Sequence, residues 1–194
     1  MKAVLELIWT GSYGSTTIDQ ICDKAGVKKG SFYYFFDSKA ELAVVSVDED
    51  WQQRRPQLDA IFSSTVPPLE RLRKYCEFGY QFQAEIREKY GCVLGCPLFS
   101  VGAEVSTQDD HRLQQKIQEI LEYKRKYLET AIRDAQAAGL VTAPDPAGKS
   151  RMLFAYYQGL QTQARIQNKL EVLKDAITGT YELLGVKNVE TVAA

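Results

Sequence analysis

The chain has 194 residues, of which 45% are hydrophobic and 25% are charged, a balance typical of a globular protein with one or two domains. Its formal net charge of −1 excludes the strongly basic class of nucleic-acid-binding protein, so a DNA-binding role would need a local cluster of charge. The sequence has no signal peptide and no apolar run of membrane-spanning length, which predicts a cytoplasmic protein that does not enter a membrane.

Neither the cysteines nor the single histidine form a recognisable metal-site pattern. Cys92 and Cys96 are separated by three residues, with no second cysteine pair or histidine nearby. His111 stands among acidic residues at a predicted helix start, where a solvated side chain is favoured over a ligand or a catalyst. Because nucleophile–base pairs are also missing, the sequence predicts no enzyme, no metal and no cofactor.

The first predicted helix spans residues 1–10, where Val4, Leu5, Ile8 and Trp9 form an apolar stripe at helical spacing. Gly11 follows directly and is expected to end it. The predicted helix buries this stripe against the elements that come next in the chain.

The segment from residue 16 to residue 39 predicts two short helices joined by a tight turn. Thr17 is a good N-cap, and Gln20 follows three residues later, as in a capping box. The first helix is expected to end before Gly26, because glycine readily adopts the left-handed conformation of a helix C-terminus. A second helix follows over about 28–35. Two such helices across a short turn are typical of a helix-turn-helix, whose second helix enters the DNA major groove.

The second helix carries side chains suited to a nucleic acid. From Lys24 to Lys39 there are four lysines and one acid, Asp37, which gives a local net charge of +3. Glycine at position 30 is a poor helix former, but it lets the backbone approach another surface closely. We therefore expect contacts to phosphates or bases from Thr17, Lys28, Lys29, Gly30, Ser31, Tyr33, Tyr34 and Lys39.

The apolar residues of this segment divide into two groups. Phe32 and Phe36 lie four residues apart, which predicts that both face inward, and Val27 is predicted to fill the turn between the helices. Phe35 has two alternatives that the sequence leaves open. It either stands exposed, where it could contact a thymine methyl group, or packs on Trp51 or a neighbouring residue.

The pattern T-x-x-x-I-x-x-x-A-G-V-x-x-G-S-F-Y-x-x-F-x-S-K-x-x-L in residues 17–42 resembles the DNA-binding domain of the tetracycline-repressor (TetR) family. The resemblance implies a helix-turn-helix domain over residues 1–50 and a helical effector-binding and dimerisation domain over 51–194. It also implies a repressor that leaves a palindromic operator on double-stranded DNA when a small-molecule effector binds or a thiol is modified. The first helix of the family is usually longer and preceded by a basic arm, whereas this sequence starts inside that pattern, so either its start is truncated or this member relies on the helix-turn-helix alone. The alternative is therefore a helical protein-interaction module with weak or lost DNA binding.

The rest of the chain predicts only helices, so the expected fold is all-α with about nine helices. A helix from Ser38 links the two expected domains, and Pro56 is expected to stop it. In the helix that follows Asp145, Met152 and Leu153 are predicted to point inward. The expected ranges after the linking helix are 68–89, 97–105, 109 or 110–138, 146–168 and 170–184.

Most aromatic side chains of these later helices are expected in the core, and a minority in an effector cavity, since ligand pockets are apolar with a few polar anchors. Gln158, Gln161 and Arg165 are candidate anchors, with a place in an interface as the equal alternative. The family resemblance implies a homodimer through the last two helices, whose surplus of apolar residues is compatible with it. The candidate effector-site residues are Tyr75, Phe78, Phe82, Cys96, Phe99, Tyr127, Tyr156 and Gln161.

Residues 95–105, GCPLFSVGAEV, resemble the same stretch in a TetR subgroup that includes the repressor of N-ethylmaleimide reductase. In some of these regulators a cysteine at the position of Cys96 responds to electrophiles or oxidants, with Cys92 as a weak candidate for its partner. The alternative is that Cys96 is a small buried apolar residue, as free cysteines usually are. Cys22 and Cys76 lie on apolar stripes and are expected in the core.

Overall fold

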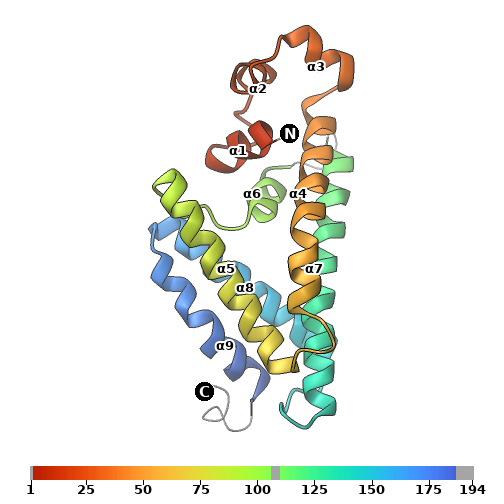
Figure 1. Cartoon of the computed structure of the whole chain (residues 1–194), viewed down its shortest axis with the longest axis vertical. Helices are drawn as coiled ribbons and strands as arrows, with labels where there is room; N and C mark the ends of the chain where they lie inside the picture. The colour runs from red at the N-terminus through yellow and green to blue at the C-terminus, as the bar shows by residue number, and fades with distance from the viewer. Residues whose placement is uncertain (1, 106–109, 187–194) are drawn as a thin grey trace. The chain divides into compact units, whose positions relative to one another are not determined.

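A computed structural model of the chain describes residues 2–105 and 110–186 (Figure 1). Within these ranges the only strand-like feature is an isolated bridge between Val141 and Val186, so the predicted all-α fold is confirmed. Asp109, one of two predicted starts of the long helix, lies outside the described residues. The elements are α1 (Lys2–Thr10), α2 (Ile18–Ala25), α3 (Lys29–Phe35), α4 (Lys39–Ile61), α5 (Pro68–Tyr90), α6 (Pro97–Glu104), α7 (His111–Ala137), α8 (Pro146–Gln167), the 3-10 helix η1 (Leu170–Lys174) and α9 (Asp175–Leu184).

The chain divides into two compact units, each built from two separate stretches of the sequence. The first unit contains residues 1–55 and 96–121, and the second contains residues 56–95 and 122–194. Helices α4 and α7 each run from one unit into the other. The functional boundary predicted between residues 50 and 51 stays a prediction.

In the first unit, α1 packs against α2 and α6, and α2 packs against α3. Val4 and Ile8 of α1 are almost completely buried, as the apolar stripe predicts. The Glu104 carboxylate at the end of α6 accepts hydrogen bonds from the Ser12 hydroxyl at 2.6 Å and from the Gly14 N–H at 2.9 Å. The loop between α1 and α2 is thereby joined to a segment that lies some ninety residues later in the sequence.

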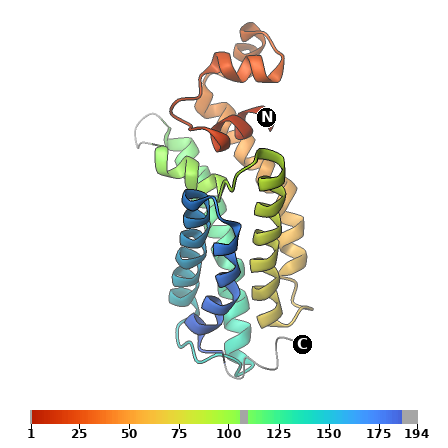
Figure 2. The same ribbon diagram turned by 90° about the vertical axis from the view of Figure 1, so that its left-hand side faces the viewer.

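In the second unit, α5, α8, η1 and α9 pack together, and Figure 2 shows α8 and α9 side by side. The loop after α5 is held by the fully buried side chain of Gln83. Its amide oxygen accepts from the N–H groups of Leu94 and Gly95, and its amide nitrogen donates to the Gly95 carbonyl at 2.8 Å. Gly95 has a φ of +67°, and a β-carbon there would lie 3.1 Å from the Gln161 carbonyl oxygen. The position of the loop therefore depends on both a glycine and a buried glutamine.

The prediction that Pro56 stops the linking helix is wrong, because α4 continues through it to Ile61. A proline inside a helix removes one backbone hydrogen bond and strains the preceding turn. Here the residues that follow compensate, since Leu58 and Phe62 are both buried and hold the last turns against the second unit's core. Tertiary packing outweighs the local preference at this point.

Two other predictions for the C-terminal helices are also wrong. Residues 170–184 form a 3-10 turn followed by α9 rather than one α-helix. Leu170 and Leu173 are buried at a spacing of three, which matches the three residues per turn of a 3-10 helix. Met152 is 52% exposed, because the buried stripe of α8 runs through Leu153 and Leu160 instead.

Candidate nucleic-acid interface

The turn between α2 and α3 forms as its sequence predicts. The Thr17 hydroxyl accepts from the Gln20 N–H at 3.2 Å, and the Gln20 side chain accepts from the Thr17 N–H at 2.8 Å. Gly26 adopts the left-handed conformation with a φ of +67°. Both ends of α2 are therefore fixed by local chemistry, which also fixes where α3 begins.

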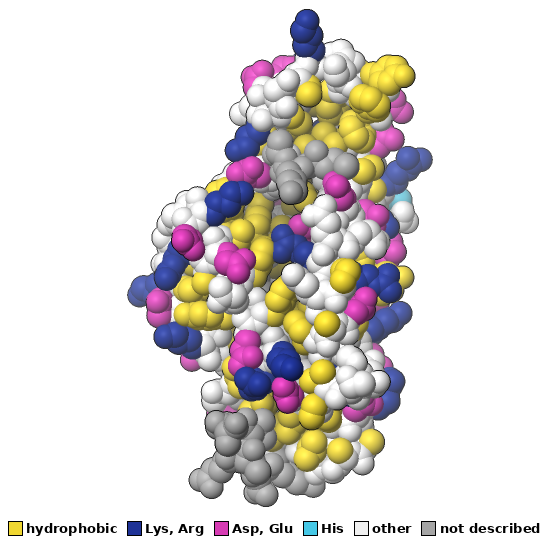
Figure 3. All heavy atoms as spheres, in the orientation of Figure 1, with side chains coloured by type: hydrophobic (Ala, Val, Ile, Leu, Met, Phe, Trp, Pro, Cys, Tyr) yellow, Lys and Arg dark blue, Asp and Glu magenta, His cyan; other side chains and the backbone are white. Residues whose placement is uncertain are grey.

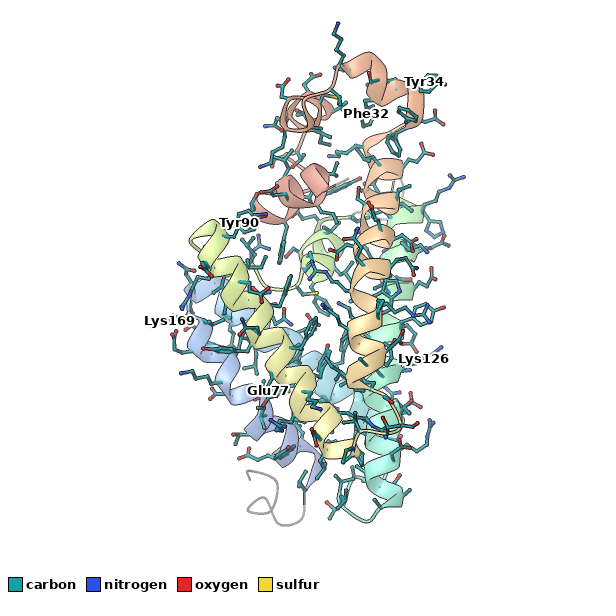
Figure 4. The ribbon with its side chains drawn as sticks, viewed as in Figure 1. Phe32, Tyr34, Glu77, Tyr90, Lys126 and Lys169 are labelled. Atoms are coloured by element: carbon teal, nitrogen blue, oxygen red, sulfur yellow. The ribbon has the colours of Figure 1, made fainter. Side chains whose placement is uncertain are left out.

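Helix α3 is anchored on one side and open on the other. Phe32 is buried, and its ring centroid lies 5.9 Å from that of Phe36, as predicted. Figure 4 shows Phe32 on the inner side of the helix, whereas Tyr34 projects outward. Tyr34 is 81% exposed. The helix thus turns a continuous surface toward solvent.

The predicted DNA-contacting residues are exposed to solvent, with one exception. In the first turn, Lys28, Lys29, Gly30 and Ser31 are all exposed. Figure 3 shows both positively charged and hydrophobic side chains at the surface in the upper part of the view, where Figure 1 places α3. Thr17, Tyr33 and Tyr34 are exposed as well. The exception, Lys39, is half-buried.

The Lys39 ammonium group is occupied by the protein itself. It donates to the carbonyl oxygens of Tyr13 at 2.7 Å and Thr16 at 3.0 Å, and it lies 4.3 Å from the centre of the Tyr13 ring. These contacts hold the start of α4 against the segment between α1 and α2. Lys39 therefore has a structural role that the sequence pattern did not reveal.

The charge of Lys29 is also engaged. Its ammonium group lies 2.7 Å from the Asp19 carboxylate in α2, and this contact raises the pKa of Lys29. Both side chains are largely exposed, so water and salt weaken their attraction. Such an exposed ion pair can open when another anion is offered to Lys29.

Val27 does not fill the turn as predicted. Its side chain is exposed, and the turn is closed instead by backbone hydrogen bonds, including one from the Val27 N–H to the Cys22 carbonyl at 3.0 Å. Val27, Tyr33, Tyr34 and Phe35 are all exposed. The outer surface of the helix-turn-helix is therefore partly apolar, although the local net charge of this segment is positive.

The candidate effector residues are divided between the two units, and their common pocket stays a prediction. Cys96 and Phe99 belong to the first unit, and the other six belong to the second. The Tyr127 hydroxyl donates to the Asp59 carboxylate, and the Tyr156 hydroxyl donates to the Asp175 carbonyl at 2.9 Å. Of the eight, Tyr75 lines a narrow apolar gap in the second unit that has no room for a water molecule. The other residues lining it are Leu72, Cys76, Leu128, Leu153, Tyr157 and Thr180.

Two buried polar atoms near the C-terminal helices are unsatisfied. The side-chain oxygen of Gln158 in α8 and the hydroxyl of Tyr181 in α9 have no hydrogen-bond partner among the described residues. Such atoms cost stability unless something else binds them. Gln158 was among the predicted polar anchors. Tyr181 was not, because the helical spacing of the sequence places it on an apolar stripe and does not show whether its hydroxyl has a hydrogen-bond partner.

The cysteines are all free thiols, and Cys22 and Cys76 are buried, as predicted. Burial raises the pKa of the Cys76 thiol to about 12, so it is protonated at neutral pH. Cys96 is buried at the N-cap of α6, and Cys92 is partly exposed.

In the described part of the chain no three His, Cys, Asp or Glu side chains are grouped as a metal site would require. None of the described helices combines the length and hydropathy needed to cross a bilayer.

Two family models match the chain. Residues 1–44 match the model described as bacterial regulatory proteins, tetR family. Residues 68–180, more than half of the chain, match the model described as tetracyclin repressor-like, C-terminal domain. The first match covers the helix-turn-helix, and the second covers the later helices from α5 into α9.

Individual proteins agree with these matches. The chain is 28% identical to an HTH-type transcriptional regulator in the lacX 3′ region of Lactococcus lactis, over 96% of this chain and 93% of that one. The crystal structure of regulatory protein TetR from Rhodobacter sphaeroides is 26% identical, with a TM-score of 0.75 over 95% of this chain and 94% of that one. Reduced Escherichia coli NemR, at 20% identity, shares the fold with a TM-score of 0.77 over 97% and 98%. The chain therefore belongs to the tetR family of bacterial regulatory proteins and is a DNA-binding transcriptional regulator.

Proposed function

We propose that this regulator is a repressor that binds a palindromic operator as a homodimer and leaves it when an effector binds to the second unit. The observation that carries the proposal is the open surface of α3, where lysines and tyrosines lie together in solvent. Relatives of the chain include proteins named as transcriptional repressors, DhaR of Mycobacterium and NemR of E. coli.

The contacts to DNA are assigned by side-chain chemistry. Lys28 and Lys29 supply positive charge for phosphates, and the Ser31 and Tyr33 hydroxyls can donate to phosphates or base edges. Thr17 and Tyr34 border the same surface. Lys39 acts through the structure, because its ammonium group is hydrogen-bonded to two carbonyl groups.

A dimer through α8 and α9 is supported by an apolar face on α8. Met152, Gly159 and Ile166 recur every seven residues, which places them on one side of the helix, and Ile166 is 78% exposed. A β-carbon at Gly159 would meet nothing within 4 Å, so another helix can approach closely there. Two-fold symmetry would pair two α3 helices for the halves of a palindrome.

The effector is proposed to be a small, largely apolar molecule with a hydrogen-bond donor. The gap beside Tyr75 is apolar, and the buried Gln158 oxygen lacks a donor. Because the gap is closed to water, the effector would have to stabilise an opened arrangement of the second unit. It would shift the population off DNA by no more than its difference in affinity for the two states.

Thiol modification at Cys96 stays a second route of release. The Cys96→Ser variant would keep DNA binding and lose release by N-ethylmaleimide. Release that persists in this variant would exclude the route.

Binding to DNA duplexes selected from a random pool tests the proposed interface. Lys29→Ala should weaken binding and reduce the slope of log K against log salt by about 0.9 for each lost phosphate contact. Lys126→Ala is the matched control, because it removes the same charge from an exposed site in the second unit. Tyr33→Ala should also weaken binding while circular dichroism stays unchanged.

Two outcomes would contradict this interface. Unchanged binding by both Lys29→Ala and Tyr33→Ala would move the contacts elsewhere. Failure to select any duplex would favour the helical protein-interaction module instead.

A further inference from the structure

We propose that Phe35 reads the methyl group of a thymine in each half of the operator. The inference rests on the proposed function, because it requires α3 to lie in the major groove. It adds an apolar element to sequence recognition, beyond the hydrogen bonds and charges of the neighbouring side chains.

The exposure of Phe35 decides between the two alternatives that the sequence leaves open. Its side chain is 69% exposed, whereas Trp51 is buried. A ring packed in the core would be largely covered. Phe35 therefore presents most of an apolar ring to solvent, where it gains stability only when another apolar group covers it.

The Phe35 ring is held in place by its neighbours. The edge-to-face contact with Tyr34 has a centroid distance of 4.8 Å, and the centroid of Phe36 lies 6.5 Å away. Phe36 in turn packs on Phe32, which is buried. The ring thus loses little further freedom when it meets a partner, and this lowers the entropic cost of a specific contact.

The place of Phe35 on α3 brings it within reach of bases. Ser31 lies one helical turn earlier on the same face, and a β-carbon at Gly30 would meet nothing within 4 Å. The first turn of α3 therefore carries only a hydrogen atom at position 30 and a small side chain at position 31, which allows close approach. An α-helix with its side chains is about 10–12 Å across, against a major-groove width of about 12 Å, and the seven residues of α3 span only about 10 Å along their axis. The whole of α3 thus fits within one groove.

The chemistry of the groove identifies the partner. The base edges there present hydrogen-bond donors and acceptors, and the C5-methyl group of thymine is the apolar feature among them. A phenyl ring offers no hydrogen bond to a phosphate oxygen or to a base edge. Of the groups within reach of α3, the thymine methyl is the one that Phe35 can cover with a gain in stability.

Replacing thymine by deoxyuridine tests this contact, because the exchange removes the methyl group and leaves the base pairing intact. The best duplex for the full-length chain is first selected from a random pool. Each thymine is then replaced in turn, and the dissociation constant is measured by fluorescence anisotropy. We expect one position in each half-site where the exchange weakens binding about fourfold, the effect of one buried CH₂ group.

The variants identify the residue that reads the methyl group. Phe35→Ala should bind the thymine and deoxyuridine duplexes equally, and Phe35→Leu should keep part of the difference. Tyr123→Ala is the matched control, since it removes an exposed aromatic ring from α7 in the second unit and not from α3, and it should keep the fourfold difference.

Two results would overturn the inference while leaving the proposed function intact. One is that the wild-type chain binds every deoxyuridine duplex as tightly as the parent. The other is that Phe35→Ala still distinguishes thymine from deoxyuridine. If no duplex is selected at all, the proposed function itself fails, and the inference fails with it.

Discussion

Aromatic side chains occupy opposite environments in the two units. On α3, Tyr34 and Phe35 stand mostly in solvent, whereas Tyr75 and Tyr157 of the second unit are buried with their ring centroids 5.0 Å apart. An apolar ring left in water gains nothing for the fold, so the α3 rings are available for a partner. The buried rings stabilise the second unit and line the apolar gap in which we propose that an effector binds. Under the proposed function, the same residue type serves recognition in one unit and packing in the other.

Glycine-to-alanine substitutions test this contrast most strongly. A β-carbon at Gly79 in α5 would lie 1.5 Å from the Tyr157 hydroxyl oxygen, so the buried Tyr157 side chain or the backbone around it has to shift. We expect Gly79→Ala to lower the free energy of unfolding by about 1–3 kcal/mol, as overpacked core variants do. Urea unfolding followed by circular dichroism measures the loss. Adding Tyr157→Phe should recover part of it, because the colliding oxygen is removed.

The matched glycine-to-alanine substitution on the exposed helix α3 should change the free energy of unfolding in the opposite direction. Gly30→Ala meets no neighbouring atom, so it should raise the free energy of unfolding by up to about 1 kcal/mol through helix propensity. It should also weaken DNA binding if the α3 backbone closely approaches the groove. If Gly79→Ala and Gly30→Ala change the free energy of unfolding equally, position 79 in α5 is not tightly packed while position 30 in α3 is open, and the contrast is wrong.

The buried thiol of Cys76 gives an effect on stability that depends on pH. Burial raises its pKa from an ordinary 9.0 to about 12, so between these values the unfolded chain loses a proton that the folded chain keeps. The unfolded state then binds fewer protons, and stability falls as pH rises, by up to about 1.4 kcal/mol per pH unit. Urea unfolding between pH 8 and 10 should therefore show a shallower decline for Cys76→Ala than for the wild type. Parallel declines would contradict the burial of this thiol.

The sequence predicted the helix-turn-helix well because its signals are local. The Thr17–Gln20 capping box and the left-handed Gly26 each act within a few residues, and both form as expected. Pro56 misled for the opposite reason, since the burial of Leu58 and Phe62 keeps α4 intact through contacts that are distant in sequence.

The candidate effector site was harder to predict. Helical spacing shows that Tyr75 and Tyr127 face other helices, but it does not show which partners they meet. The Tyr127 hydroxyl turned out to bind Asp59, and the gap beside Tyr75 is lined mainly by residues predicted for the core. The tie between Lys39 and the carbonyl group of Tyr13 likewise depends on a contact across 26 positions.

The smallest predicted effect is on DNA affinity and concerns the exposed ion pair between Asp19 and Lys29. The Asp19 carboxylate lies 2.7 Å from the Lys29 ammonium group and competes with any phosphate for it. Asp19→Asn should therefore tighten DNA binding and steepen the slope of log K against log salt, because Lys29 then displaces more counterions on binding. Asp23→Asn removes the same charge from another exposed position of α2, so it separates loss of the ion pair from the change in net charge. If both variants tighten binding equally, Lys29 is not restrained by Asp19 and net charge alone sets the affinity.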